Sequence, residues 1–324
     1  MSTVLTPAAA AELGRGLSAV CAQVGVDPAS AKLLKFTMNA VFAVDRYVVR
    51  MARGDAAVRA AQRLTRVVGA LHAAGAPIVE LAEELGEQPI VAGEWVATIW
   101  HRIGSAGDGM PLDLAAPLRV IHSLDRLSVD VPAWDIVKKC RRRIDQAAAL
   151  TGTAADQFDG WSHEQLHHSA DDLFAVLRER GDRIEERLAL VQWALPRGVI
   201  HGDAHSGNLI LPTAPQRPGP APDAIICDLD SVSVGPREWD LVATAHGVVR
   251  FGRPRPHHDA LADAYGFDIL TWSGWPVLRD LRELQLVTSV LDNAAGRPDV
   301  ACQLGHRLRS YLSNNDGIVW TRYH

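Results

Sequence analysis

The sequence has little of several features that mark common protein classes. Its four cysteines are scattered, with no CxxC pair and no dense spacing. That pattern does not suit a disulfide-stapled secreted scaffold and predicts reduced thiols in a cytoplasmic protein. No apolar run approaches the length of a membrane span, and the N-terminus lacks a charged region followed by an apolar core. We therefore expect a soluble intracellular chain with no membrane partner.

An excess of one charge is also missing. The formal net charge is -5, from 33 Lys and Arg against 38 Asp and Glu, which gives no electrostatic footprint for nucleic acid. The basic run KKCRRR, residues 138–143, has no aromatic residues interleaved. Because consecutive residues point all around a helix, we interpret this run as a solvated helix face. We expect no nucleic-acid partner.

The chain is long, and the spacing of its apolar residues changes from a strand pattern to a helix pattern along the sequence. Its 324 residues, 48% of them hydrophobic, suit two lobes. Strand patterns occupy 33–37, 40–45, 47–52, 78–85 and 94–103, with helix patterns at 7–24 and 55–74. Helical spacing then dominates at 112–124, 132–150, 162–195, 241–249, 258–264, 277–291 and 300–312. We expect an α+β fold with a small lobe, residues 1–103, and a larger mainly helical lobe, residues 104–324. The small lobe holds a five-stranded antiparallel sheet and a helix.

The densest group of polar residues lies between 199 and 231. Asp203 lies in a short polar loop, Asn208 opens the apolar run NLIL, and Asp228 ends the apolar run AIIC after a proline-rich connection. Both runs predict strands, and together they predict a hairpin. Antiparallel pairing places Asn208 close to Asp228. An amide and a carboxylate oxygen suit Mg²⁺ that is also bound to phosphates, and Asp203 is left to act as a base.

These parts are the ones that phosphoryl transfer from a Mg-nucleotide requires. The segment HGDAHSGN, residues 201–208, resembles the catalytic loop of the aminoglycoside phosphotransferase and choline kinase family, which is related to the protein kinases. The resemblance implies a two-lobed protein-kinase-like fold, ATP or GTP as co-substrate, Mg²⁺, and a small-molecule hydroxyl acceptor. It makes Asp203 the catalytic residue and Asn208 and Asp228 the metal ligands.

Further residues match the family. GPREWDL, residues 235–241, resembles it and implies that Asp240 braces the catalytic loop. Arg50, on the strand face opposite Tyr47, stands where the family has Lys or Arg. The resemblance implies a contact between Arg50 and nucleotide phosphates, and the alternative is a solvent-facing edge charge. The resemblance also implies nucleotide contacts in a hinge at residues 100–104, at the end of the fifth strand, and we add the loop between the first two strands; the residues are Asn39, Trp100, His101 and Ile103.

One departure from the family keeps an alternative open. The helix at 55–74 normally supplies a Glu that pairs with the strand cation, but Leu64 stands there and Gln62 is the nearest polar residue. Arg50 is then held by the nucleotide or by a carboxylate that the sequence does not identify. The missing Glu leaves a catalytically silent kinase-like module as the alternative to an active enzyme.

A second alternative comes from the two histidines that flank Asp203. The segment from His201 to His205 superficially resembles a metal-ligand cluster, so a metallohydrolase is a remote alternative that leaves Asn208 and Asp228 without a role. The acceptor itself is not predicted. Acidic and basic residues of the terminal helices nearly balance, which does not indicate the acidic pocket that a polycationic antibiotic favours. Three tryptophans there suit either packing or stacking on a ring: Trp272, Trp275 and Trp320.

Overall fold

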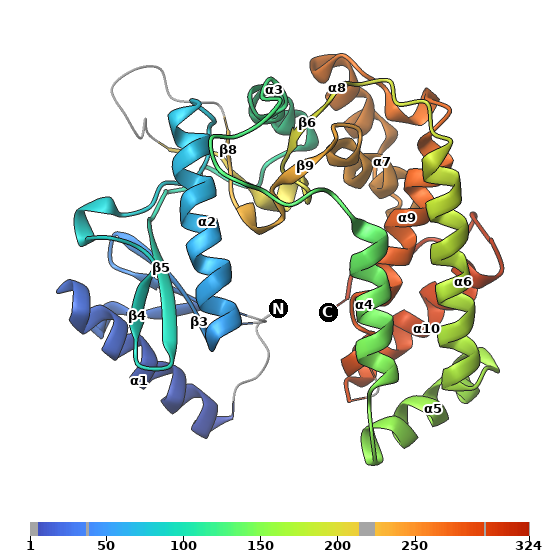
Figure 1. The fold of residues 1–324 in the computed structure, drawn as a ribbon, viewed down its shortest axis with the longest axis horizontal. Coiled ribbons are helices and arrows are strands. Elements are labelled where there is room, and N and C mark those ends of the chain that lie inside the picture. The colour runs from blue at the N-terminus through green and yellow to red at the C-terminus, as the bar shows by residue number, and fades with distance from the viewer. Residues whose placement is uncertain (1–5, 37–38, 214–223, 295, 324) are drawn as a thin grey trace. The chain divides into compact units, whose positions relative to one another are not determined.

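The computed structural model describes residues 6–36, 39–213, 224–294 and 296–323. Contacts divide the chain into two compact units (Figure 1). The first unit comprises Met1–Pro132 and Ser206–Ser233, and the second comprises Ala133–His205 and Val234–His324. The expected division into functional lobes after residue 103 remains a prediction, because the contacts group residues by packing alone.

The first unit contains the five-stranded antiparallel sheet that the sequence predicts, in the order β1-β2-β3-β5-β4. The strands are β1 Lys32–Phe36, β2 Ala40–Val44, β3 Tyr47–Arg53, β4 Ile90–Ala92 and β5 Trp95–His101. The strand predicted at 78–85 is wrong, since that segment makes only isolated bridges at Ile78 and Leu81 before a 3₁₀ turn. The fourth strand instead forms a hairpin with β5. Gly93, at φ +62°, closes the two-residue turn between Ala92 and Trp95.

Two helices flank this sheet. Helix α1, Pro7–Val24, begins where the Thr6 side chain accepts a hydrogen bond from Ala9 N and ends at Gly25 in the left-handed conformation. It packs on the sheet face that carries Tyr47, Val49 and Met51. Helix α2, Asp55–Ala73, contacts β3 and β5. The unit also contains α3, Ala115–His122, and the small sheet of β7, Leu209–Ile210, with β8, Ile225–Ile226.

The second unit is mainly helical. Figure 1 shows α4, α6 and α9 side by side, in agreement with their mutual contacts. The helices are α4 Ile136–Ala148, α5 Thr153–Leu166, α6 Ala170–Ala189, α7 Trp239–Phe251, α8 Arg255–Tyr265, α9 Trp275–Thr288 and α10 Pro298–Leu312. The single helix predicted at 162–195 is wrong. His167 takes the left-handed conformation and Ser169 caps a new helix by accepting from Asp172 N, so the chain breaks between α5 and α6. Strands β6, Arg197–Ile200, and β9, Ser233–Pro236, form a two-stranded sheet.

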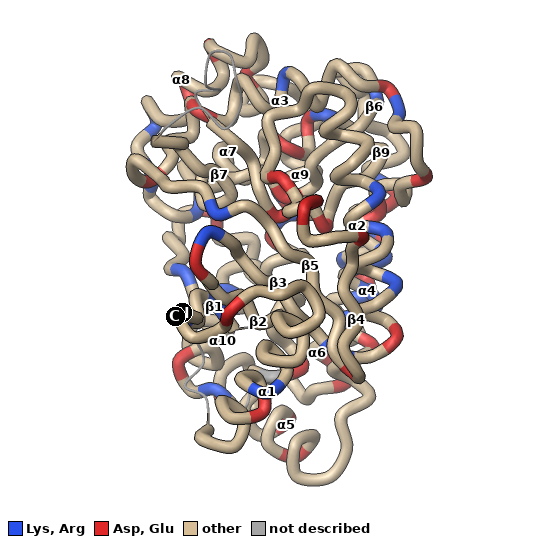
Figure 2. Tube along the Cα trace, turned by 90° about the vertical axis from the view of Figure 1, so that its left-hand side faces the viewer, with Lys and Arg blue, Asp and Glu red and all other residues tan. Residues whose placement is uncertain are grey.

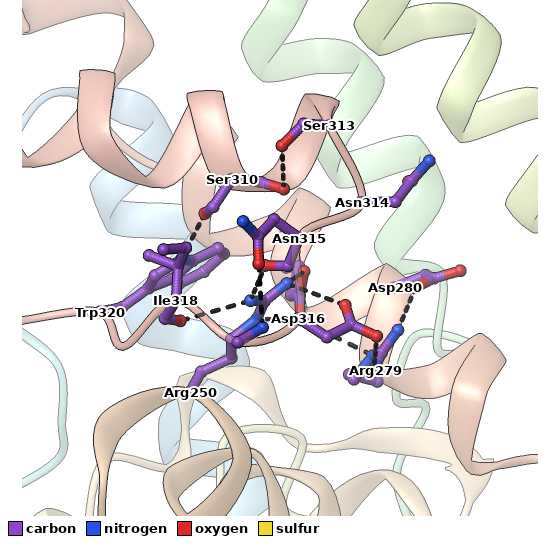
Figure 3. A network of polar contacts seen from close by, with 12 residues as sticks. Arg250, Arg279, Asp280, Ser310, Ser313, Asn314, Asn315, Asp316, Ile318 and Trp320 are labelled. Atoms are coloured by element: carbon purple, nitrogen blue, oxygen red, sulfur yellow. Dashed lines mark hydrogen bonds and ion pairs between the residues drawn. The ribbon is translucent and has the colours of Figure 1, made fainter.

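The segment after α10 is tied into the second unit by Arg250 of α7, whose side chain is 1% exposed. Its guanidinium donates to both carboxylate oxygens of Glu283, at 2.7 and 2.8 Å, and to the Asn315 carbonyl at 2.7 Å. Figure 3 shows Arg250 pointing toward Asn315 and Ile318, with Trp320 beside it. Trp320 and Trp275 are buried, and Trp272 packs against Trp193. These contacts favour packing for all three tryptophans.

Charged residues of both signs are distributed over the described chain. Figure 2 shows Lys and Arg interspersed with Asp and Glu along the described chain. No described helix combines the length and the apolar character needed to cross a membrane.

The contact between α1 and the sheet gives a stability test. A Cβ added at Gly16 would lie 2.4 Å from Trp95 Cε2, so Gly16→Ala should destabilise the protein by about 1–3 kcal/mol through overpacking. Gly14, in the same helix, has open space around it, and Gly14→Ala should stabilise the protein by about 0.5–1 kcal/mol through helix propensity. Thermal and denaturant unfolding measure both effects, and shifts of the same sign would contradict the packing.

Candidate functional site

The hairpin predicted around Asn208 and Asp228 is present in the first unit. Leu209 pairs with Ile226, and Cys227 N donates to the Asn208 carbonyl at 2.8 Å. This register leaves Asn208 and Asp228 at the same end of the hairpin, as the sequence predicts. Asn208 is only 7% exposed. The proline-rich connection falls largely on residues 214–223, outside the described residues.

Asp228 takes a backbone conformation that non-glycine residues rarely adopt, with φ +63° and ψ +59°. Such a conformation costs on the order of 1 kcal/mol and persists only where its surroundings impose it. Here the 3₁₀ turn that follows, Leu229–Ser231, contacts α2. Burial raises the pKa of Asp228, and so do a hydrogen bond and repulsion from Asp230, whereas Arg50 and Lys35 act in the opposite direction. Two carboxylates therefore crowd this end of the hairpin.

Arg50 has the carboxylate partner that the sequence did not identify. Its Nη2 lies 2.6 Å from Asp230 Oδ2, with the two side chains 23% and 33% exposed. With its amide oriented to satisfy both atoms, the Asn39 side-chain oxygen accepts from Arg50 Nη2 at 2.7 Å and Nε at 3.2 Å. Helix α2 presents buried Leu64 at the position where the family has Glu. Arg50 is thus held by Asp230, which lies in the turn that follows Asp228. No local sequence pattern predicts that these two residues pair.

The three hinge candidates differ in how their backbones are used. Trp100 and His101 belong to β5, and His101 N also donates to the Glu80 carbonyl at 3.0 Å. The Trp100 ring is buried and donates to Thr98 Oγ1 at 3.0 Å. Ile103 lies beyond the strand, and its backbone makes no hydrogen bond with the described residues. Among these three residues, Ile103 has the backbone groups best able to receive a ligand.

In the second unit, the loop that carries Asp203 is braced by Asp240, as the resemblance implies. Asp240 is fully buried in the first turn of α7. Its Oδ2 accepts from His201 N at 2.6 Å and its Oδ1 from Gly202 N at 2.7 Å. Trp239 Nε1 adds a bond to the Gly202 carbonyl at 3.0 Å. Gly202 adopts φ +83°, a backbone conformation in which a side chain would be strained.

The Asp203 side chain lies among cations. Arg282 Nη1 of α9 is 3.3 Å from Asp203 Oδ1 and 2.7 Å from Gln285 Oε1. Burial by itself would raise the pKa of Asp203, but Arg282, His205 and His201 together hold it below its ordinary value. Asp203 is therefore ionised at neutral pH, and its side chain is still 38% exposed. It combines a fixed negative charge with access from solvent.

Helix α4 brings two further cations toward this loop. Lys139 and Arg143 are half-buried, whereas Lys138 and Arg142 are exposed. Arg143 Nη1 donates to the Gln285 carbonyl at 3.2 Å, and the charge of Asp203 acts on both Lys139 and Arg143. The interpretation of KKCRRR as a solvated helix face therefore holds for Lys138 and Arg142 and is wrong for Lys139 and Arg143. Both pairs, 138/142 and 139/143, have i, i+4 spacing, so spacing places each pair on one helix face without telling which face is covered.

The alternative of a histidine-based metal centre has little support in the described residues. Within residues 6–36, 39–213, 224–294 and 296–323, no three His, Cys, Asp or Glu residues are grouped as metal ligands. His201 is buried, and its Nδ1 accepts from Asp203 N at 3.3 Å. Burial also lowers the pKa of His205, despite the opposite effect of Asp203. His201 thus takes part in the hydrogen bonding of the loop.

The model of the phosphotransferase enzyme family matches residues 37–281, well over half of the sequence. The chain belongs to this family. The predicted enzyme class, a phosphotransferase, is thereby confirmed, together with the resemblance seen in residues 201–208. Comparison with the curated proteins found no match.

Solved structures similar to the phosphotransferase share its fold at low sequence identity. Choline kinase LicA from Streptococcus pneumoniae has a TM-score of 0.64 and 13% identity, covering 94% of this chain and 99% of that one. Spectinomycin phosphotransferase APH(9)-Ia, with ADP and spectinomycin, has a TM-score of 0.53 and 16% identity, and the match covers 89% of each chain. Amicoumacin kinase hAmiN, with AMP-PNP, Ca²⁺ and Ami, has a TM-score of 0.57 and 11% identity, and the match covers 91% of this chain and 92% of that one. The α+β, protein-kinase-like fold is confirmed.

The charge around Asp203 yields a prediction that does not depend on activity. Removing the guanidinium in Arg282→Met should raise the pKa of Asp203, because a cation that favours the carboxylate is lost while burial remains. An NMR titration of the Asp203 carboxyl measures the change. Arg279→Met serves as a matched control, since Arg279 on the same helix pairs with Asp316 instead. A pKa that falls or stays constant in Arg282→Met would contradict this electrostatic account.

Proposed function

We propose that the phosphotransferase moves the γ-phosphate of ATP or GTP to a hydroxyl of a small molecule. The similar structures support this proposal, because they include kinases of choline, spectinomycin and amicoumacin. ADP and AMP-PNP in two of those structures favour an adenine nucleotide. An aminoglycoside, another antibiotic, an amino sugar or a related metabolite alcohol all fit this acceptor class. A cytoplasmic location, expected from the scattered cysteines, remains a prediction.

One observation carries the proposal. Asp203 is an ionised, partly exposed carboxylate on a loop whose backbone is fixed by two short hydrogen bonds to Asp240. A fixed carboxylate is what orients an attacking hydroxyl, because catalysis of phosphoryl transfer is mostly positioning and charge stabilisation. Such a group has no evident purpose in a structural module, so we favour an active enzyme over a silent one.

The residues at the hairpin end fit Mg²⁺. Asn208 and Asp228 supply an amide and a carboxylate oxygen at the same end of the β7–β8 pair. Mg²⁺ takes oxygen ligands and commonly uses one or two from protein, with phosphates and water completing its shell. The crowding of Asp228 and Asp230 also favours a cation there. When bound, Mg²⁺ would neutralise charge on the nucleotide phosphates.

The chain's own residues then have separate tasks. Asp203 orients the acceptor hydroxyl and takes its proton as the oxygen attacks the γ-phosphorus. The bond between that phosphorus and the bridging oxygen breaks, and the nucleoside diphosphate leaves with the electron pair. Arg50, held by Asp230 and Asn39, directs its positive charge to the phosphates. The backbone of Ile103, and neighbouring Trp100 and His101, would receive the base.

The central experiment removes the proposed base. Asp203→Asn keeps the shape of the side chain but not its charge, so kcat should fall by about 10²–10⁴-fold, the usual contribution of an acid or base. Nucleotide affinity, measured by calorimetry with Mg²⁺, should stay within about twofold, because the base does not bind the nucleotide. Full activity in this variant would overturn the assignment.

The same measurements separate the alternatives. Nucleotide binding without turnover of any hydroxyl compound by the wild-type enzyme would favour the silent module. Stabilisation by Zn²⁺ alone, with no effect of nucleotide, would favour the metallohydrolase.

The ion pair of Arg50 provides an independent prediction. In Asp230→Asn the guanidinium loses its carboxylate partner, so nucleotide KM should rise roughly tenfold, equivalent to about 1.4 kcal/mol. Glu94→Gln is a matched control, since Glu94 lies 3.8 Å from Arg53 at the other end of β3. An unchanged nucleotide KM in Asp230→Asn would contradict the role of the pair. A raised Mg²⁺ requirement alone would show that Asp230 acts on the metal instead of on Arg50.

A further inference from the structure

Three cations from two helices of the second unit interact with the charge of Asp203, and one of them contacts it. Arg282 of α9 contacts it directly at 3.3 Å. Lys139 and Arg143 of α4 lie one helical turn apart and are half-buried, Arg143 donates to the Gln285 carbonyl of α9 at 3.2 Å, and the charge of Asp203 acts on both cations. Lys139 makes no hydrogen bond or ion pair through its side chain with the described residues. These positions give the neighbourhood of Asp203 a net positive charge.

The charged groups on every neighbouring element support this sign. The loop contributes His201 and His205 beside Asp203, and the segment after α10 contributes Arg322, whose charge acts on His205. On the described residues, the acid that opposes this set is Asp292, which acts on Arg143. Other carboxylates of α9 are engaged elsewhere, because Glu283 pairs with Arg250 and Asp280 with Arg187. Asp203 and Asp292 therefore offset only part of the charge of Lys139, Arg143 and Arg282.

Holding a half-buried ammonium beside two guanidiniums is unfavourable unless an anion compensates it. Burial and the charges of Arg143 and Arg142 lower the pKa of Lys139, and Asp203 only partly opposes them. An anionic ligand would relieve this repulsion. An alkylammonium ligand would meet the same cations and be repelled, since charge complementarity selects against the wrong sign.

We propose that the acceptor carries an anionic oxygen group, which binds Lys139 and Arg143 while its hydroxyl reaches Asp203. The inference rests on the proposed function, because it assigns these residues to the acceptor of the same transfer. Carboxylates and phosphate monoesters share the required chemistry. Arg143, bonded to the Gln285 carbonyl and thus fixed in position, offers a guanidinium to either group. Choline-like and polyamine acceptors are disfavoured.

A competing role for the same cations is contact with the phosphate in transfer. That role would affect every acceptor equally and would change nucleotide kinetics. The anionic-acceptor role instead predicts that the effect depends on the acceptor's charge. The two roles therefore predict different changes in the KM of the nucleotide and in the KM of each acceptor when these cations are removed.

The test compares related hydroxyl compounds in which one substituent is neutral, anionic or cationic. One series is glycerol, glycerate, glycerol 3-phosphate and 3-aminopropane-1,2-diol, and a second is glucose, glucuronate, glucose 6-phosphate and glucosamine. Binding to Asp203→Asn in the presence of Mg-ATP is measured by calorimetry, so a result is obtained without turnover. In at least one series the carboxylate or phosphate should bind tenfold or more tightly than the amine and the neutral compound. Equal binding, or tighter binding of the amine, overturns the proposal.

Variants on α4 then locate the effect. Lys139→Met with Arg143→Met should weaken the binding of the preferred anionic compound tenfold or more and leave the nucleotide KM within twofold of its original value. Lys138→Met with Arg142→Met removes the same charge from the exposed face of the same helix and should weaken neither anion nor nucleotide binding, because loss of Arg142 only favours the charged form of Lys139. Equal losses for anionic and neutral compounds, or a raised nucleotide KM, assign the cations to the phosphate in transfer and overturn the proposal. Thermal unfolding checks that both double variants are folded.

Failure of the proposed function gives a different result. Full phosphotransferase activity in Asp203→Asn would remove the base assignment without altering the charge preference seen in binding. Loss of the charge preference would leave the effect of Asp203→Asn on kcat intact. The two conclusions therefore stand or fall on separate measurements.

Discussion

The carboxylate of Asp240 is the constraint on which the second unit's part of the site depends. It is fully buried and accepts from two successive backbone N–H groups, those of His201 and Gly202. Hydrogen bonds to an ionised acceptor are about twice as strong as neutral ones. They fix a loop in which Gly202 has a positive φ, and thereby set the direction of Asp203 toward Arg282. The orientation of Asp203 is set by helix α7 before any substrate binds.

In the first unit a different carboxylate has the organising role. Asp230 pairs with Arg50, and Asp228, two residues earlier, stands at the end of the hairpin. The position of the strand cation is therefore coupled to the turn that carries the metal-ligand candidate. In the usual arrangement of this family, a helix supplies the partner of the cation. Here α2 has buried Leu64 at that position, and the helix contacts the turn Leu229–Ser231 that carries Asp230.

Features fixed by local chemistry could be predicted from the sequence. Helix α1 follows from its cap residues at both ends, the hairpin from two apolar runs, and the face of Arg50 from strand alternation. The segment 78–85 is no strand, despite its pattern, because a competing hairpin, closed by Gly93, takes the place next to β5. The pairing of Arg50 with Asp230, and of Arg282 with Asp203, joins residues far apart in sequence. A single sequence carries no signal for such pairs.

The burial of Arg250 has a consequence for the order in which the protein folds during synthesis. Chains generally fold as units from the N-terminus as they leave the ribosome. Neither unit is continuous here, since residues 206–233 of the first interrupt the second. The guanidinium of Arg250 needs Glu283 and the Asn315 carbonyl, and Trp320 lies beside it. The second unit therefore completes its core only when almost the entire chain has emerged, and until then α7 carries a cation without its partners.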